Sequence, residues 1–377
     1  MSEVRLVEPG EPIPWDDLRD GPWARTFLEP MLRDGVTPYV GNVHTELRVL
    51  IAEGHVLPLT VNPGGETNAW VVSPRNAYID YAAEELREVD SGVLRASLKG
   101  AIGGLGAMVR AGRIDRVVHV DNWLLSTNLH PELSRGTVAA IQRLLRDRWP
   151  DHAHAWRSVH AWRGEPLPEH LAGLGYQGVP ARSCWVWDPR DRHHRGARDI
   201  KRDRRLLRDS GYEVVDADGL TDGDAPRLRA LYDALYLDKY SKHNPWFTDA
   251  FVRMALAGGL TVRALCKDGR LDGVVGFVIR AGFMTTPLFG YDTSLPIEVG
   301  LYRMCSQLLI ESALERDLIL HQSAGAASFK RNRRAESVLE HTFVDTTHLP
   351  LRRRAAWTVL REAMERVAVP IVRARGL

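Results

Sequence analysis

Cysteine is scarce in this chain, and the three that occur lie far apart. Cys184, Cys266 and Cys305 form no Cys-x-x-Cys pair, a pattern that argues against a disulfide framework and against a structural zinc site. Separated thiols in odd number are typical of reduced, buried cysteines in an intracellular protein. We therefore expect a cytoplasmic protein with no bound metal.

Other familiar signals are also missing. No run approaches the roughly 18 apolar residues of a membrane span, and the first residues, Met1 to Arg5, lack the basic-then-apolar order of a signal peptide. The net charge is only +2, which does not favour a general polyanion binder. Neither a Gly-x-Ser-x-Gly elbow nor a Cys–His signature is present, so no strained nucleophile is indicated.

The sequence does contain one order of strand, turn, helix and strand that occurs twice. A strand-like run at 117–120 leads through a polar turn to a helix that opens at Gly136 and to a strand that carries Arg157. A similar run at 284–287 leads through a turn to a helix that carries Gly300 and to a strand that ends near His321. Gly136 lies 21 positions before Arg157, and Gly300 lies 21 positions before His321. Matched spacing predicts two copies of one fold, whose strand-to-helix turns are typical anion-binding places.

The length of 377 residues suits about two domains of roughly 150 residues. We expect an N-terminal domain over 1–190 with an arm over 1–40, a basic linker helix over 191–211, and a C-terminal domain over 212–377. Alternation and turn residues predict strands at 46–53, 55–62, 68–73, 117–120, 153–159, 183–187, 212–215, 260–267, 274–280, 283–288, 318–322 and 341–345. Apolar periodicity predicts helices at 79–88, 92–111, 136–149, 168–174, 199–208, 226–240, 247–256, 298–315 and 351–367.

A meander followed by one parallel crossover in each half defines the expected fold class. It is α/β (α+β), with two tandem domains, each a mixed and mostly antiparallel sheet with helices on both faces.

This layout resembles the Gcn5-related N-acetyltransferase (GNAT) superfamily. It is similar in particular to tandem members such as the Fem-type aminoacyltransferases and the BioF2-like acetyltransferase domain. Three segments carry the likeness: the basic helix 201–211, the helix 231–240, and the stretch 287–331 with its Gly-Tyr-Asp turn and its Ser323-to-Arg331 loop. The likeness covers about 200–345 by motif and 45–188 by layout. It implies an acyltransferase whose co-substrate is acyl-CoA or aminoacyl-tRNA, with no tightly bound cofactor.

One departure from the family bears on the donor. Acetyl-CoA users of the superfamily carry a glycine-rich turn whose N–H groups cradle pyrophosphate at a helix start. Here the second glycine is replaced by Tyr302, Glu298 lies beside the turn, and the first half offers only Gly136. The departure favours an aminoacyl-tRNA or an acyl carrier protein as the acyl donor over CoA, without excluding CoA.

Acyl transfer to an amine needs a held carbonyl, an oxyanion donor and a base. We propose Asp292, His321 and Tyr291 as catalytic candidates, since a histidine suits base work near neutral pH. The alternatives are an Asp292 that bonds its own turn and a structural His321 at a strand end. Thr285 and Thr286 would hold donor or acceptor, or would simply suit a strand.

The remaining substrate-binding candidates fall into three groups. Polar groups around a loop that borders the acceptor pocket in the family are Lys239, Tyr240 and Asn244, with a helix cap as the alternative. Charged or polar groups near the second crossover are Tyr302, Arg303, Ser323, Lys330 and Arg331, with a solvated charge run as the alternative. Candidates in the first half are Asn122, Trp123 and Asn128, which form a second ligand site or a scaffold.

The basic stretch 190–209 would contact tRNA through phosphates, or would be an exposed helix with internal ion pairs. The sequence therefore predicts an enzyme, an acyltransferase that moves an acyl or aminoacyl group from an activated carrier to an amine of a small molecule. The alternatives are an acetyl-CoA-dependent N-acetyltransferase and a non-catalytic module that binds RNA or an acyl carrier.

Overall fold

One twelve-stranded mixed sheet runs through the protein, a computed structural model that describes residues 4–65, 67–85 and 92–370. The strand order is β1-β2-β3-β4-β5-β12-β6-β11-β10-β9-β8-β7. Only the pairs β4–β5 and β10–β11 are parallel, and the other neighbours in this order are antiparallel. The expected fold class, a mixed and mostly antiparallel sheet, is confirmed.

The first half builds a meander and then one crossover. Its strands are β1 (Val4–Val7), β2 (Glu46–Ala52), β3 (His55–Asn62) and β4 (Val117–Val120). Helix α4 (Arg135–Arg148) then returns the chain to β5 (Ala153–Val159), which pairs parallel to β4. A helix between parallel neighbours is the connection that such pairing requires.

The second half repeats this plan. Its meander is β7 (Glu213–Asp216), β8 (Thr261–Lys267), β9 (Arg270–Arg280) and β10 (Phe283–Tyr291). Helix α10 (Leu301–Arg316) then crosses to β11 (Ile319–His321), parallel to β10. The repeat predicted from the matched spacing is therefore confirmed by the strand pairing.

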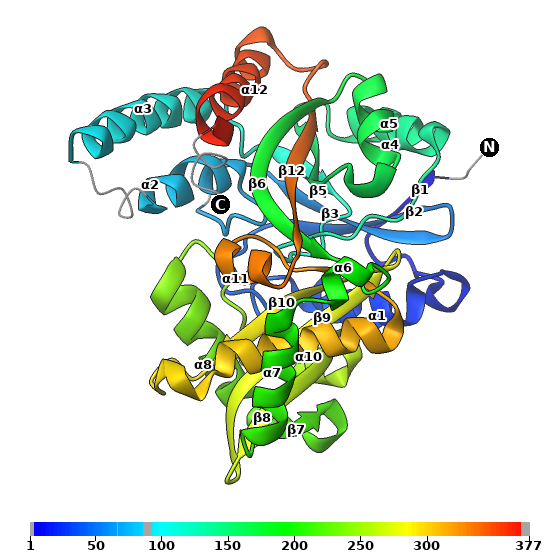
Figure 1. The fold of residues 1–377 in the computed structure, drawn as a ribbon. Helices are drawn as coiled ribbons and strands as arrows, with labels where there is room; N and C mark the ends of the chain where they lie inside the picture. The colour runs from blue at the N-terminus through cyan, green and yellow to red at the C-terminus, as the bar shows by residue number, and fades with distance from the viewer. Residues whose placement is uncertain (1–3, 66, 86–91, 371–377) are drawn as a thin grey trace.

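The two halves are joined by an exchange of strands. Strand β12 (Glu336–Asp345) comes from the end of the chain but lies between β5 and β6 (Gln177–Trp187) of the first half. Strand β6 in turn lies between β12 and β11. Figure 1 shows these two long strands side by side through the middle of the molecule. Each half thus completes its sheet with a strand of the other.

Helices cover both faces of the sheet in each half, as expected. In the first half, α4 and α5 (Leu167–Gly173) bury apolar side chains on one face, while α12 (Leu351–Ala363) and the end of α3 (Gly92–Ala111) cover the other. In the second half, α7 (Arg198–Asp209) and α10 share one core, and α8 (Ala225–Asp233), α9 (Asp249–Met254) and α1 (Gly21–Asp34) share another. The short helices are α2 (Tyr81–Glu85), α6 (Arg192–Arg195) and α11 (Ala327–Asn332). Within the described ranges, no helix has the length and apolarity to cross a membrane.

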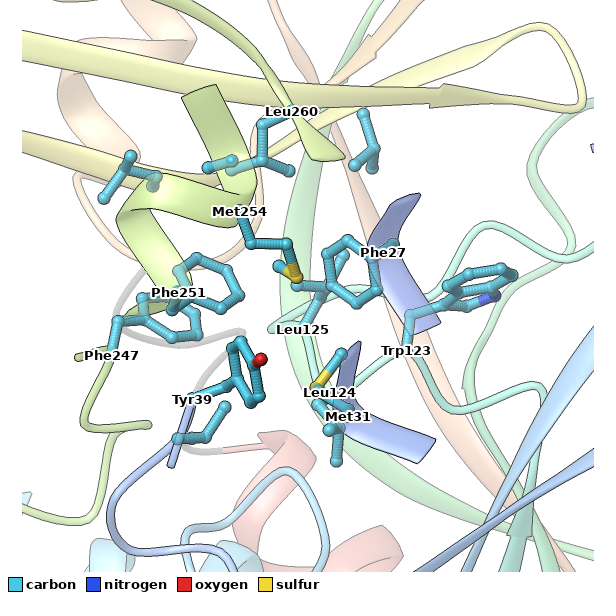
Figure 2. Packing of buried hydrophobic residues seen from close by; sticks show 14 of the residues in the cluster. Phe27, Met31, Tyr39, Trp123, Leu124, Leu125, Phe247, Phe251, Met254 and Leu260 are labelled. Carbon is cyan, nitrogen blue, oxygen red and sulfur yellow. The ribbon is translucent and has the colours of Figure 1, made fainter. Parts of the chain in front are cut away.

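The N-terminal arm packs against both halves. Phe27 and Met31 of α1, Trp123 from the loop after β4, and Phe251 and Met254 of α9 belong to one buried cluster. Figure 2 shows these side chains converging from the three segments. Burial of a side chain of this size contributes about 1.5–3 kcal/mol, so the arm and this loop fasten the halves together.

Some expected elements differ from the structure. Residues 68–73 form no strand, because Asn68 and Ser73 bond to backbone groups instead: Asn68 Oδ1 accepts from His44 N, and Ser73 Oγ accepts from Asn76 N. Strand β10 extends through Tyr291, which the sequence places in a turn. The helix expected over 79–88 reaches beyond the described residues after Glu85.

Candidate active site at the junction of the two halves

Both pairs of parallel strands part at their carboxyl ends. The β10–β11 pairing ends with Thr285 opposite His321, whereas β10 continues along β9 as far as Tyr291. The β4–β5 pairing ends at Val120, and β5 runs on beside β12. Beside Thr286 the two parallel strands are therefore no longer paired, and a similar end of pairing occurs in the first half.

In the first half, side chains of the chain itself bridge the parted strands. Arg157 Nη1 donates to Asn122 Oδ1 at 3.0 Å, and Asn122 Nδ2 donates to Thr60 Oγ1 at 2.9 Å. Asn128 Oδ1 accepts from Trp123 N at 3.1 Å, and Asn128 Nδ2 donates to Asn122 Oδ1 at 3.3 Å. The candidates Asn122, Trp123 and Asn128 thus lie together, and their mutual bonds fit the scaffold alternative.

An ion pair between a partly buried arginine and a fully buried glutamate lies between the two separations. Arg182 and Glu340 stand opposite each other on β6 and β12, and Arg182 Nε donates to Glu340 Oε2 at 2.6 Å. Arg182 also donates to Ser323 Oγ at 3.1 Å and to Thr127 Oγ1 at 2.9 Å. Burial opposes the Glu340 charge, but Arg182 and His321 outweigh it and hold the pKa of Glu340 far below its usual range.

His321 is fully buried at the end of β11. Its Nε2 lies 3.1 Å from Glu340 Oε1, although without the alignment of a good hydrogen bond. Its Nδ1 accepts from Ser323 N at 3.2 Å, which places the ring proton on Nε2. Burial lowers the pKa of His321, with Glu340 acting in the opposite direction. Because Nδ1 already accepts a hydrogen bond, the ring can take a further proton there only after Nδ1 releases Ser323.

The two threonines of β10 differ in their partners. Thr286 Oγ1 donates to the backbone, 3.0 Å from Gly276 O and 3.2 Å from Leu288 O. The Thr285 hydroxyl is buried and has no hydrogen-bond partner among the residues that the structure describes. An unpaired buried hydroxyl carries a desolvation penalty of about 1–3 kcal/mol. Thr285 therefore offers an unused polar group where the strands part.

Asp292 and Tyr291 lie at the far end of β10. Asp292 Oδ2 accepts from Arg227 Nη2 at 2.8 Å, and Oδ1 accepts from Ser294 N at 3.0 Å. Burial opposes ionisation, but these bonds lower the pKa of Asp292 to about 2. A carboxylate with that pKa and both oxygens engaged fits the turn alternative better than a base. Burial raises the pKa of the half-buried Tyr291 phenol.

Tyr302 belongs to an aromatic group and Arg303 to an ion-pair network. The Tyr302 ring lies 4.7 Å from Phe329 and 6.0 Å from Tyr291, centroid to centroid. Arg303 Nε donates at 2.7 Å to Asp203 Oδ1 of α7, so the guanidinium faces the linker helix.

The loop after β11 holds the remaining charged candidates. Lys330 Nζ donates to the carbonyls of Gln322, Ser323 and Ala324, at 2.6 to 3.1 Å. Burial lowers the pKa of Lys330 to about 7. Arg331 is exposed, and its Cζ lies 5.6 Å from the Trp185 ring centroid. Lys330 thus acts as a loop anchor, whereas Arg331 faces solvent.

The helical segment Ala234–Tyr240 that continues α8, and the loop after it, bring one of their three candidates to the junction. Asn244 is buried, and its Oδ1 accepts from Trp70 Nε1 at 2.9 Å. Lys239 and Tyr240 are exposed and contact each other, with Lys239 Nζ 5.8 Å from the Tyr240 ring centroid. Asn244 therefore joins the junction through Trp70 of the first half.

Side chains lie beside both helix starts that could cradle a pyrophosphate. At α4, the Glu53 carboxylate accepts from Ser134 N at 3.2 Å and from Thr137 Oγ1 at 2.5 Å. At α10, Gly300 has a left-handed φ of +78°, and an added Cβ would lie 2.6 Å from Leu206 Cδ2. The anion at the first start opposes phosphate binding, and the leucine at the second packs against Gly300.

Cys184, His321 and Glu340 bring a thiol, an imidazole and a carboxylate within 4.8 Å of one another. Two cations, Arg182 and Lys330, adjoin the group, and Nδ1 of His321 already accepts a proton donor. Burial raises the pKa of the Cys184 thiol well above its usual range. These surroundings suit a neutral thiol rather than a cation ligand.

Several junction residues were missed by the sequence reasoning: Trp70, Thr127, Arg157, Arg182 and Glu340. The spacing that pairs Arg157 with His321 was a usable signal for one of them. Arg182 and Glu340 carry no local signal, because their contact depends on the strand exchange.

Comparisons with known proteins bear on the fold. No family model and no curated protein matches the chain. Among solved structures, FemX covers 59% of this chain and 80% of its own at 7% identity and TM-score 0.47. L-PGS from Bacillus licheniformis covers 65% and 82% at 12% identity and TM-score 0.45. A tandem GNAT protein from the clavulanic acid biosynthesis pathway covers 91% and 98% at 12% identity and TM-score 0.40. All three similarities have TM-scores below 0.5 and low sequence identity.

Proposed function

We propose that this protein is an acyltransferase that moves an acyl or aminoacyl group from a macromolecular carrier to an amine of a small molecule. The observation that carries the proposal is the parting of β10 and β11 at Thr285 and His321. Parted parallel strands leave backbone groups unpaired by their neighbour, and such groups can hold an activated carbonyl. The unpartnered Thr285 hydroxyl lies at the same point.

The choice of a carrier other than CoA rests on the side chains beside the two helix starts. Glu53 places a negative charge where a pyrophosphate would lie in the first half, and Leu206 covers Gly300 in the second. Helix α7 meanwhile exposes Lys201 and Arg205, for which no ion pair is formed with the described residues. Exposed cations on a helix beside the second crossover suit the phosphates of a tRNA.

The test is carrier discharge. The purified protein is incubated with a mixture of radiolabelled aminoacyl-tRNAs and, separately, with acetyl-CoA, each with a panel of primary amines. The proposal predicts protein- and amine-dependent loss of label from tRNA, with slower release of free CoA. Faster turnover of acetyl-CoA would favour the N-acetyltransferase alternative. Binding of tRNA without discharge by any amine would favour the non-catalytic module.

A variant at Thr285 separates chemistry from folding. Thr285→Val keeps the shape and removes the unpartnered hydroxyl, so stability stays equal or rises. We expect carrier discharge to fall at least tenfold if this hydroxyl holds the donor. The matched control is Thr286→Val, which removes a hydroxyl already bonded to the backbone. Equal turnover in the Thr285 variant and wild type would move the site away from β10.

A further inference from the structure

Arg157 is a buried cation with no carboxylate at ion-pair distance among the described residues. It lies on β5 with 6% of its surface exposed, and the one hydrogen bond that its guanidinium donates to a described residue is the 3.0 Å bond to the neutral Asn122 side chain. No carboxylate among the described residues forms an ion pair with it. The other two buried arginines each bond a buried aspartate: Arg280 with Asp121, and Arg333 with Asp203. Arg157 is therefore the exception among them.

A second cation lies close to Arg157. The Cζ atoms of Arg157 and Arg182 lie 4.9 and 5.0 Å from the centroid of the same Trp70 ring. Two guanidinium groups thus share one carboxylate, that of Glu340, which forms its ion pair with Arg182. Burial, together with Arg182, lowers the pKa of Arg157 to about 9, although Glu340 and Tyr78 act in the opposite direction. A buried cation in this state is stabilised when an anion joins it.

The backbone holds the Arg157 side chain in place. The next residue, Ser158, adopts a left-handed φ of 59°, and the β5–β12 register shifts between His341 and Phe343. His130 Nε2 bonds the Arg157 carbonyl oxygen at 2.6 Å. An irregular strand of this kind re-aims a side chain, and here it presents the guanidinium at the first parting of strands.

We infer that Arg157, beneath Trp70, binds the carboxylate of the acceptor, so that the acceptor is an amine that also carries a carboxylate, such as an amino acid or a peptide. The planar guanidinium fork matches a carboxylate, and a single unmatched charge suits a monoanion better than a phosphate dianion. The inference rests on the proposed function for the role of the ligand. Arg182, which contacts the same indole, bonds Ser323 beside His321, and this links the subsite to the second parting of strands.

The test measures anion binding in the absence of any donor. Thermal unfolding midpoints are recorded at constant ionic strength with N-acetylglycinate, with its neutral analogue N-acetylglycinamide, and with inorganic phosphate. Wild type, Arg157→Met and Arg157→Lys are compared, and Arg352→Met, which removes an exposed arginine of α12, is the control. We expect a saturable rise with N-acetylglycinate in wild type and control, and none with the amide.

The variants distinguish a binding role from a structural one. Arg157→Met should weaken the apparent affinity for N-acetylglycinate at least tenfold, and should raise the midpoint without ligand because it removes an unmatched charge. Arg157→Lys should weaken affinity at least threefold, and it carries the test if the methionine variant does not fold. A larger Arg157-dependent rise with phosphate would overturn the carboxylate assignment. Unchanged affinity in the variants would overturn the subsite. Because no donor is present, either result leaves the transferase proposal standing, and a failed discharge assay leaves this binding result intact.

Discussion

Arg182 and Glu340 face each other in register across β6 and β12, with 2.6 Å between Nε and Oε2. One residue comes from the first half of the chain and the other from its last strand. The pair therefore exists only when the strands have been exchanged, and it lies between both points where parallel strands part. The same contact therefore affects both the stability of the fold and the geometry of the candidate site.

Removal of the Glu340 charge should destabilise the protein. Glu340→Gln leaves the partly buried Arg182 without its anion, and breaking such a pair by removing one partner typically costs about 3–5 kcal/mol. The folded-state pKa of Glu340 lies far below its usual range, so its stabilisation is complete above the unfolded-state value of about 4.3 and is lost as the pH falls below it. Urea unfolding from about pH 5 to about pH 2 should therefore show a smaller loss of unfolding free energy in the variant than in wild type.

The control for that measurement is Glu169→Gln, which changes an exposed carboxylate of α5. Its free energy of unfolding should fall with pH as steeply as that of wild type. If the free energy of unfolding of Glu340→Gln falls with pH just as steeply, other carboxylates cause the pH dependence.

Gly300 and Gly325 offer a matched pair, since both have a φ of +78°. Gly325 has open space around an added Cβ, whereas Gly300 meets Leu206 Cδ2 at 2.6 Å. Gly325→Ala should cost only the backbone strain, about 1 kcal/mol, while Gly300→Ala should cost about 2–4 kcal/mol. Chemical unfolding of both variants, and of Gly300→Ala with Leu206→Ala, measures the difference. Equal costs at the two positions would mean that α7 does not cover this helix start.

Asp203 joins three helices through one buried carboxylate. It accepts from Arg303 of α10 at 2.7 Å and from Arg333, just after α11, at 2.7 Å. Asp203→Ala should destabilise the protein by about 3–5 kcal/mol, because two cations lose their partner. The exposed Asp209→Ala at the end of the same helix should stay within about 0.5 kcal/mol of wild type. A small effect at Asp203 would show that solvent replaces the carboxylate.

Charge reversal on α7 tests the carrier. Arg205 is exposed and lies in the basic helix, so Arg205→Glu should weaken tRNA binding and lower the slope of log affinity against log salt by about 1. Fluorescence titration at several salt concentrations measures this slope. The control is Arg352→Glu on α12, which should bind tRNA as wild type does. Identical slopes for all three proteins would remove α7 from the tRNA surface.

The fold was predictable where its signals are local. Strand β3 follows from an apolar run between turn residues, helix α7 follows from a basic amphipathic run, and the two crossovers follow from the spacing of Gly136 and Gly300. Asn68 and Ser73 misled the strand prediction, because short polar side chains compete for backbone groups.

The site was less predictable because its contacts are non-local. Asn244 meets Trp70 across 174 positions and Arg182 meets Glu340 across 158. Neither distance leaves a pattern in the sequence. Asp292 was a reasonable candidate by residue type, yet Arg227, which no local motif pairs with it, engages its carboxylate.

The exchange of β6 and β12 also governs when the protein can mature. A nascent chain that has emerged through residue 190 still lacks the strand that will lie beside β5, because β12 begins only at Glu336. The N-terminal half must therefore wait, with an open sheet edge, until β12 has been made. Truncation before Glu336 would leave both halves incomplete at once.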